Sequence, residues 1–185
     1  MRSQQYIRKT LLLAGVLALG GCLVSEEPVL GASNGRATPL EPGAYVMCAV
    51  NEDEDDCQPF DLSYDESGLY SFEPEDEDPV KMRFRRIGRQ GYAVQSHEDD
   101  GYLYYYGAGN ADLFRLTMMM CSELPEHLRA RLINRGDLEA EDDDFETCIV
   151  KTRKGLTAAA RAYHRGNVQS EEEIALEFTR APESP

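Results

Sequence analysis

The middle of this chain is divided into short runs in which apolar and polar residues alternate, separated by turn-forming sequences such as Asp-Glu-Ser-Gly and Asp-Asp-Gly. Alternation with a period of two is typical of half-buried strands, and strands spaced by about ten residues are typical of antiparallel sheets. The predicted strands cover residues 44–50, 59–64, 68–72, 80–86, 92–96, 102–106 and 113–121.

The run that begins at Val80 shows the alternation most clearly. Val80, Met82 and Phe84 share one face of the predicted strand, and basic residues occupy the other face. A sheet built from such strands has one buried face and one face in water.

The pattern changes after Cys121. Leucines repeat every four residues within 123–135 and predict a helix, and the alanine-rich stretch 156–165 predicts a second. Residues 146–152 read as a strand. In residues 170–178, Ser170 to Glu173 match a helix capping box, whereas the apolar residues that follow alternate as in a strand. We favour a strand. The fold class predicted is α+β and β-rich: an antiparallel meander or small barrel of about seven to nine strands, with two short helices in the C-terminal third.

The N-terminus has the layout of an exported signal peptide. Arg2, Arg8 and Lys9 form a positive start, and residues 10–21 form an uncharged stretch that ends in Gly20-Gly21-Cys22. A membrane-spanning helix needs about 20 apolar residues, so this stretch is too short for permanent passage. The sequence therefore predicts cleavage after Gly21.

Leu19-Gly20-Gly21-Cys22 resembles the lipobox of bacterial lipoproteins. The resemblance covers residues 1–23 and implies that Cys22 is acylated and becomes the new N-terminus. Leu23 follows where an inner-membrane retention signal has Asp, so the resemblance further implies the outer membrane, with the domain in the periplasm or at the surface. An ordinary cleaved signal with a chance cysteine is the alternative.

The predicted domain organisation has three parts. Residues 1–21 are the signal peptide, and residues 22–43 are the acylated cysteine and a flexible tether that is rich in Pro, Gly and Ser and has no apolar period. Such a tether of about 20 residues would reach on the order of 25 Å. Residues 44–181 form a single disulfide-bonded domain, long enough to have its own core.

Apart from Cys22, the chain has four cysteines, an even number in an exported protein, which predicts two disulfides. We favour Cys48 with Cys57, which flank an acidic loop, and Cys121 with Cys148, which join neighbouring strand-like runs.

The net charge of −15 becomes −18 when the three basic residues of the signal peptide are removed. Nucleic acid would be repelled, whereas a basic envelope protein would be attracted.

No metal site or cofactor is predicted. The acidic tracts at 52–56, 73–78 and 139–146 lack the spacing of a calcium-binding loop and read as solvated loops. The methionines at 118–120 could in principle bind copper(I) through their thioether sulfurs. Consecutive residues of a strand point to opposite faces, so at most Met118 and Met120 could converge. We favour the interpretation that these side chains fill the core.

Tyrosines in the run 102–106 are the candidate interaction surface. Tyr102, Tyr104 and Tyr106 share one face of the predicted strand, and Tyr105 lies on the other. Tyrosine is enriched at interfaces, although cross-strand packing would also explain the pattern.

No catalytic residues are predicted. His97, His127 and His164 have no recognisable partners in the sequence, and carboxylates are too numerous to single out a pair. We therefore expect a non-catalytic, membrane-anchored envelope lipoprotein that acts as an accessory or interaction domain. The alternative is a specific binding module, either for a small ligand or as an inhibitor of a basic hydrolase such as lysozyme.

Overall fold

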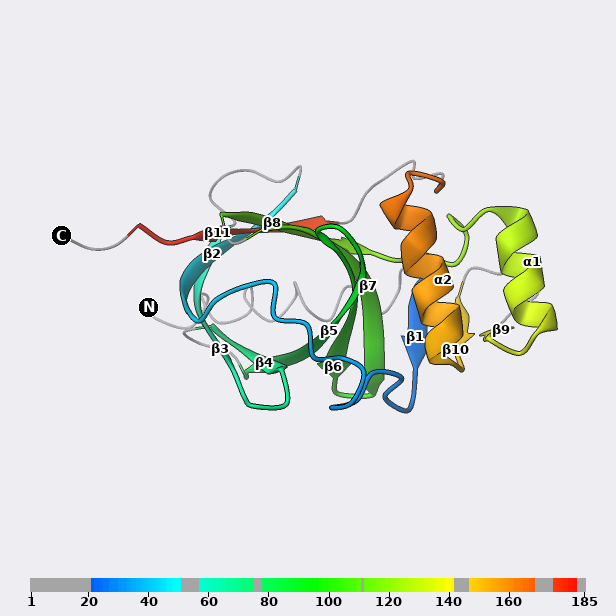
Figure 1. Ribbon diagram of the computed structural model, residues 1–185, viewed down its shortest axis with the longest axis horizontal. Helices are drawn as coiled ribbons and strands as arrows, with labels where there is room; N and C mark the ends of the chain where they lie inside the picture. The colour runs from blue at the N-terminus through cyan, green and yellow to red at the C-terminus, as the bar shows by residue number, and fades with distance from the viewer. Residues whose placement is uncertain are drawn as a thin grey trace, which may run out of the picture.

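The computed structural model describes residues 21–50, 57–74, 78–110, 112–141, 147–168 and 175–182 (Figure 1). Eleven strands and two helices are formed within these residues. They are β1 (Leu23–Ser25), β2 (Gly43–Ala49), β3 (Gln58–Tyr64), β4 (Leu69–Pro74), β5 (Val80–Gly88), β6 (Gly91–Glu98), β7 (Gly101–Gly109), β8 (Leu113–Met118), α1 (Glu126–Asn134), β9 (Leu138–Ala140), β10 (Cys148–Val150), α2 (Arg153–His164) and β11 (Ala175–Arg180).

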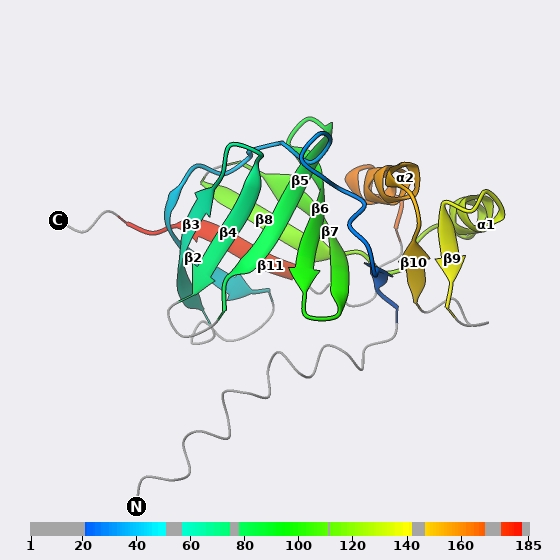
Figure 2. The ribbon, with the colours of Figure 1, turned by 90° about the horizontal axis from the view of Figure 1, so that it is seen from below.

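Eight of the strands close into an antiparallel barrel in the order β6-β5-β4-β3-β2-β11-β8-β7, with β7 pairing back to β6 (Figures 1 and 2). Closure leaves no unpaired strand edge in the barrel. Strands β2 to β8 follow one another as hairpins, and β11 enters between β2 and β8. The predicted β-rich fold and its seven alternating runs are therefore confirmed, and residues 175–180 form a strand.

Aromatic rings fill the barrel. Phe60 lies 5.4 Å from both Phe72 and Phe178, measured between ring centroids, and Tyr70 lies 4.9 Å from Phe84. Offset and edge-to-face pairs of this kind add to the stability that burial itself provides. Met82 and Phe84 point inward, as the alternation of their strand predicts, so the barrel interior is a packed core.

Residues 22–43 are not a flexible tether, and this prediction is wrong. Leu23–Ser25 form β1, and the following segment, residues 26–42, crosses the front of the barrel as a strap (Figure 1). Leu30 and Leu40 are 1% exposed, and the Tyr70 hydroxyl donates to the Leu40 carbonyl at 2.6 Å. The strap lacks an apolar period because single side chains, and not a regular face, hold it to the barrel.

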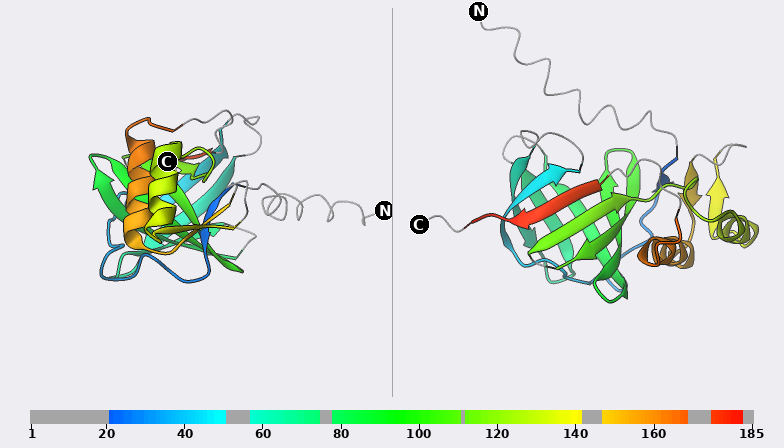
Figure 3. Two further views of the ribbon diagram at one scale, coloured as in Figure 1. Left: turned by 90° about the vertical axis from the view of Figure 1, so that its right-hand side faces the viewer. Right: turned by 90° about the horizontal axis from the view of Figure 1, so that it is seen from above.

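A second layer covers one flank of the barrel. β1 pairs with the first half of β7, then with β10, which pairs with β9. α2 lies over the outer faces of β5, β6 and β7, and both helices are on this flank (Figure 3). Ala159 and Ala160 on α2 are fully buried, because small side chains allow the helix to approach the sheet closely.

The predicted disulfides are confirmed as Cys48–Cys57 and Cys121–Cys148. The second bond joins the end of the barrel to β10 in the second layer. The helix predicted at 123–135 forms from Glu126, and that predicted at 156–165 begins earlier, at Arg153, where the Thr152 hydroxyl accepts from the Gly155 amide at 3.1 Å. Of the helices described, neither is long and apolar enough to cross a membrane.

Candidate functional site

The outer wall of the barrel carries two rows of side chains that run across β4, β5, β6 and β7. Strand register places Ser71, Lys81, His97 and Tyr102 in one row. The same register places Leu69, Arg83, Gln95 and Tyr104 in the next. Neighbours within a row on one face are close enough for their side chains to interact.

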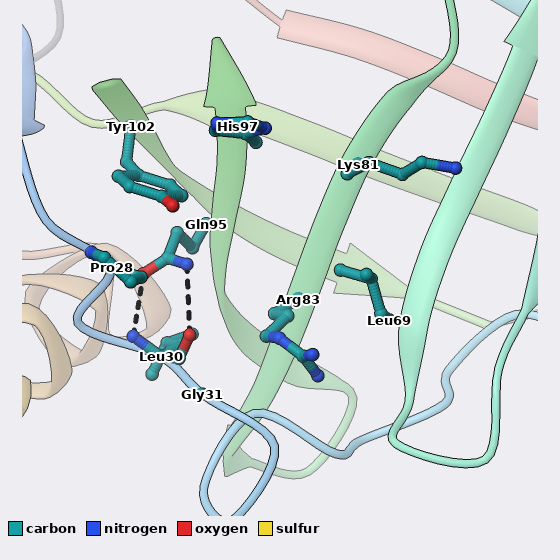
Figure 4. Close-up of a pocket in the computed structure, with 9 residues that line it drawn as sticks. All are labelled: Pro28, Leu30, Gly31, Leu69, Lys81, Arg83, Gln95, His97 and Tyr102. Atoms are coloured by element: carbon teal, nitrogen blue, oxygen red, sulfur yellow. Dashed lines mark hydrogen bonds between the residues drawn. The ribbon is translucent and has the colours of Figure 1, made fainter. Parts of the chain in front are cut away.

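A pocket of about 330 Å³ opens over these rows (Figure 4). The barrel wall supplies its floor, and the strap supplies one side through Pro28, Leu30 and Gly31. Lys81 and Arg83 lie on the opposite side from Pro28 and Tyr102 (Figure 4). The pocket therefore combines two cations with an apolar and aromatic wall.

Both cations are held by serines. Lys81 Nζ donates to Ser71 Oγ at 2.6 Å, and the Arg83 guanidinium donates to the Ser67 carbonyl at 3.0 Å and to its hydroxyl oxygen at 3.1 Å. Each serine in turn contacts a carboxylate: Ser71 Oγ donates to Glu73 at 2.9 Å, and Ser67 Oγ donates to Asp65 at 2.7 Å.

The carboxylate of Asp65 organises the β3–β4 turn beneath Arg83. The Leu69 amide and the Ser67 hydroxyl, together with the charge of Arg83, lower the pKa of the Asp65 carboxyl below its usual value. The turn thus places Ser67 where it orients the guanidinium.

Gln95 fastens the strap to the floor of the pocket. Its side-chain oxygen accepts from the Val29 amide at 2.8 Å and from the Leu30 amide at 2.7 Å, and its side-chain nitrogen donates to the Leu30 carbonyl at 3.1 Å. Gln95 is 4% exposed, so these three bonds satisfy a buried amide and fix the pocket wall.

His97 and Tyr102 form the outer end of the pocket. Their rings lie 5.1 Å apart between centroids with an interplanar angle of 30°, and His97 is exposed. This pair presents flat, partly apolar surface to the pocket.

The tyrosines predicted as an interaction surface are mostly structural, so that prediction is wrong for three of the four. Tyr104 is fully buried, with its hydroxyl 2.6 Å from Ser25 Oγ, and Tyr105 packs against the barrel core. The hydroxyl of Tyr106 lies 3.0 Å from His164 Nδ1 on α2. The second layer covers this part of β7, and only Tyr102 reaches the pocket.

Cys22 is not part of either disulfide and is 7% exposed. Its Sγ lies 3.3 Å from Met118 Sδ and 3.9 Å from Met120 Sδ. Burial raises the pKa of the Cys22 thiol. Met118 and Met120 do converge, as the alternation allows, and Met119 fills the core between the layers.

The predicted acidic loops are only partly visible. Residues 52–56 lie outside the described residues, as do 75–77 and 142–146. In the part of the chain that is described, no three His, Cys, Asp or Glu side chains are grouped as metal ligands would be.

The fold and the site define a disulfide-bonded, eight-stranded antiparallel barrel with a strapped pocket on its outer wall. Comparisons with protein families, with curated proteins and with solved structures found no match to this chain.

Proposed function

We propose that the protein is a non-catalytic envelope lipoprotein, anchored at the outer membrane through acylated Cys22, whose barrel domain is a binding module. The observation that carries the binding role is the outer-wall pocket, whose lining combines Lys81 and Arg83 with the tilted ring pair of His97 and Tyr102. Its groups are cations, an amide and rings, which recognise a ligand more readily than they activate a nucleophile.

The anchor rests on the basic start, the short apolar stretch and Gly20-Gly21-Cys22. In the folded domain the Cys22 sulfur is enclosed by methionine thioethers, and its raised pKa disfavours the reactive thiolate. Acylation would therefore take place before β1 folds onto β7, and the Cys22 side chain would turn out of this enclosure once its sulfur carries a lipid.

Capture of a basic protein is a second candidate, favoured by the barrel topology. The β2–β3, β4–β5 and β6–β7 connections all leave from one end of the barrel, because alternate hairpins of a meander share an end. In sequence these connections carry residues 52–56, 75–78 and 98–100, all acidic, and no basic residue. A positively charged partner would be attracted to that end.

Two measurements test the main proposal. Mass spectrometry of the N-terminal peptide from native membranes should find acylated Cys22, and Cys22→Ser should abolish palmitate incorporation. An unmodified Cys22, or a different mature N-terminus, contradicts the anchor.

A photoreactive phenylalanine analogue at His97 tests the binding role in cells. It should capture a ligand, whereas the same analogue at exposed Gln58 on β3 should not. Equal labelling at both positions contradicts the assignment of the pocket. The same analogue at Asp99, in the β6–β7 connection, tests the second candidate, which is supported if basic proteins are captured there and not at His97.

A further inference from the structure

We propose that the outer-wall pocket binds a small organic anion, with a carboxylate or phosphate between Lys81 and Arg83 and a ring against Tyr102. This inference rests on the proposed binding role and adds the chemical class of the ligand. It concerns a soluble molecule of about one ring, because about 330 Å³ is near the lower limit for ligand pockets.

The first argument is the pairing of charges. The chain has 34 acidic and 19 basic residues, so carboxylates are in excess over cations. Arg115, Arg180 and Lys151 do form ion pairs. Among the described residues, Lys81 and Arg83 form none, and serines hold them instead. Their links to carboxylates run through the serines, to Glu73 and Asp65, so a ligand anion would not have to displace a directly bound carboxylate.

The second argument is donor capacity. A lysine ammonium has three N–H donors and an arginine guanidinium has five. Within the described structure, Lys81 uses one and Arg83 uses two. The two residues share a face of β5 and are separated by about 7 Å along the strand. Both side chains are long, so a rotation of each head group away from its serine would let one anionic group contact both.

The third argument is the wall opposite the cations. The three hydrogen bonds of Gln95, called the Gln95 clamp below, hold Val29 and Leu30, and Pro28 directly precedes them. The Tyr102 ring lies beside the His97 ring. A ring attached to the anion would lie against this surface, and aromatic contacts are favourable beyond the area that they bury. The pocket would therefore select a ligand by the charge of its anionic group at one side and by the shape of its ring at the other.

The test uses the full-length protein purified from membranes in detergent, titrated calorimetrically with phenyl phosphate, benzoate and phenol. Phenyl phosphate or benzoate should bind at least tenfold more tightly than phenol, and the ratio of the first two identifies which anion the pocket prefers. Lys81→Met and Arg83→Met should each weaken anion binding by about tenfold, because each removes a charge-assisted hydrogen bond.

Three variants serve as controls. Lys81→Arg keeps the charge and should retain binding within about threefold, which separates lost charge from a damaged fold. Arg180→Met removes a cation from β11, away from the pocket, and should leave binding unchanged. Tyr102→Ala should weaken phenyl phosphate by about fivefold.

Phenol binding as tightly as the anions, or equal weakening by Arg180→Met and Lys81→Met, overturns the inference. These outcomes leave acylation of Cys22 and crosslinking at His97 unaffected. If the ligand captured at His97 proves neutral or cationic, the proposal of an anionic ligand is refuted, whereas the proposed binding role is not.

Discussion

The Gln95 clamp decides whether the segment after Cys22 is a strap or a tether, and its removal can be estimated from the structure. Gln95→Leu deletes three hydrogen bonds, at 2.8, 2.7 and 3.1 Å, to the backbone of Val29 and Leu30. At about 1 kcal/mol of net stabilisation for each bond, docking of the strap should weaken by about 3 kcal/mol. The openings should be local, because the barrel core lies on the other side of the wall.

Proteolysis measures this local opening. Arg36 is an exposed trypsin site within the strap, and cleavage that follows a rapid opening equilibrium reports the open population. A loss of about 3 kcal/mol increases that population by about 100-fold, so the fragment ending at Arg36 should accumulate about 100 times faster.

Gln58→Leu, at an exposed position on β3, makes the same chemical change without touching the strap and should cleave at the wild-type rate. If Gln95→Leu is cleaved no more than threefold faster than Gln58→Leu, the clamp does not hold the strap and the reasoning fails.

Two further results are expected. Replacing Cys121 and Cys148 by Ser should lower the free energy of unfolding by about 3.6 kcal/mol, and replacing Cys48 and Cys57 should lower it by about 2.7 kcal/mol. The first loss is larger because that disulfide closes the longer loop, with a sequence separation of 27 residues against 9. The reverse order in urea unfolding would contradict the loop-entropy account. Burial raises the pKa of Tyr104 from 10.0 to about 12, so stability is complete below pH 10 and falls as the pH rises towards 12. Between pH 10 and pH 12 the wild type should lose about 2 kcal/mol more than Tyr104→Phe, as compared by urea unfolding at each pH. Equal losses would show that Tyr104 does not carry the effect.

The barrel was predictable because its physical cause is local. Alternation in the strand from Val80 reports burial on one side, and Met82 and Phe84 are inside as that pattern requires. The cysteine pairing also follows from proximity in sequence. The strap was not predictable, because Leu30 and Leu40 acquire their partners from β6 and β4, which are distant in the chain.

The site was only half predictable. Alternation shows that Lys81 and Arg83 leave the barrel core, but it cannot show that register sets His97 beside Lys81. Tyr104 looked like an exposed platform because the sequence does not reveal that β1 and α2 cover β7. Serine contacts in place of ion pairs at Lys81 and Arg83 are likewise visible only in three dimensions.

The burial of Leu23, one residue after Cys22, limits how an anchored domain can explore its surroundings. A coil of about 20 residues would let the barrel sample a radius on the order of 25 Å, whereas one peptide step leaves about 3.8 Å of slack. A lipid on Cys22 would thus hold this side of the barrel close to the bilayer. Partners embedded in the same leaflet would meet it by two-dimensional diffusion, and soluble ones would have to come to the membrane.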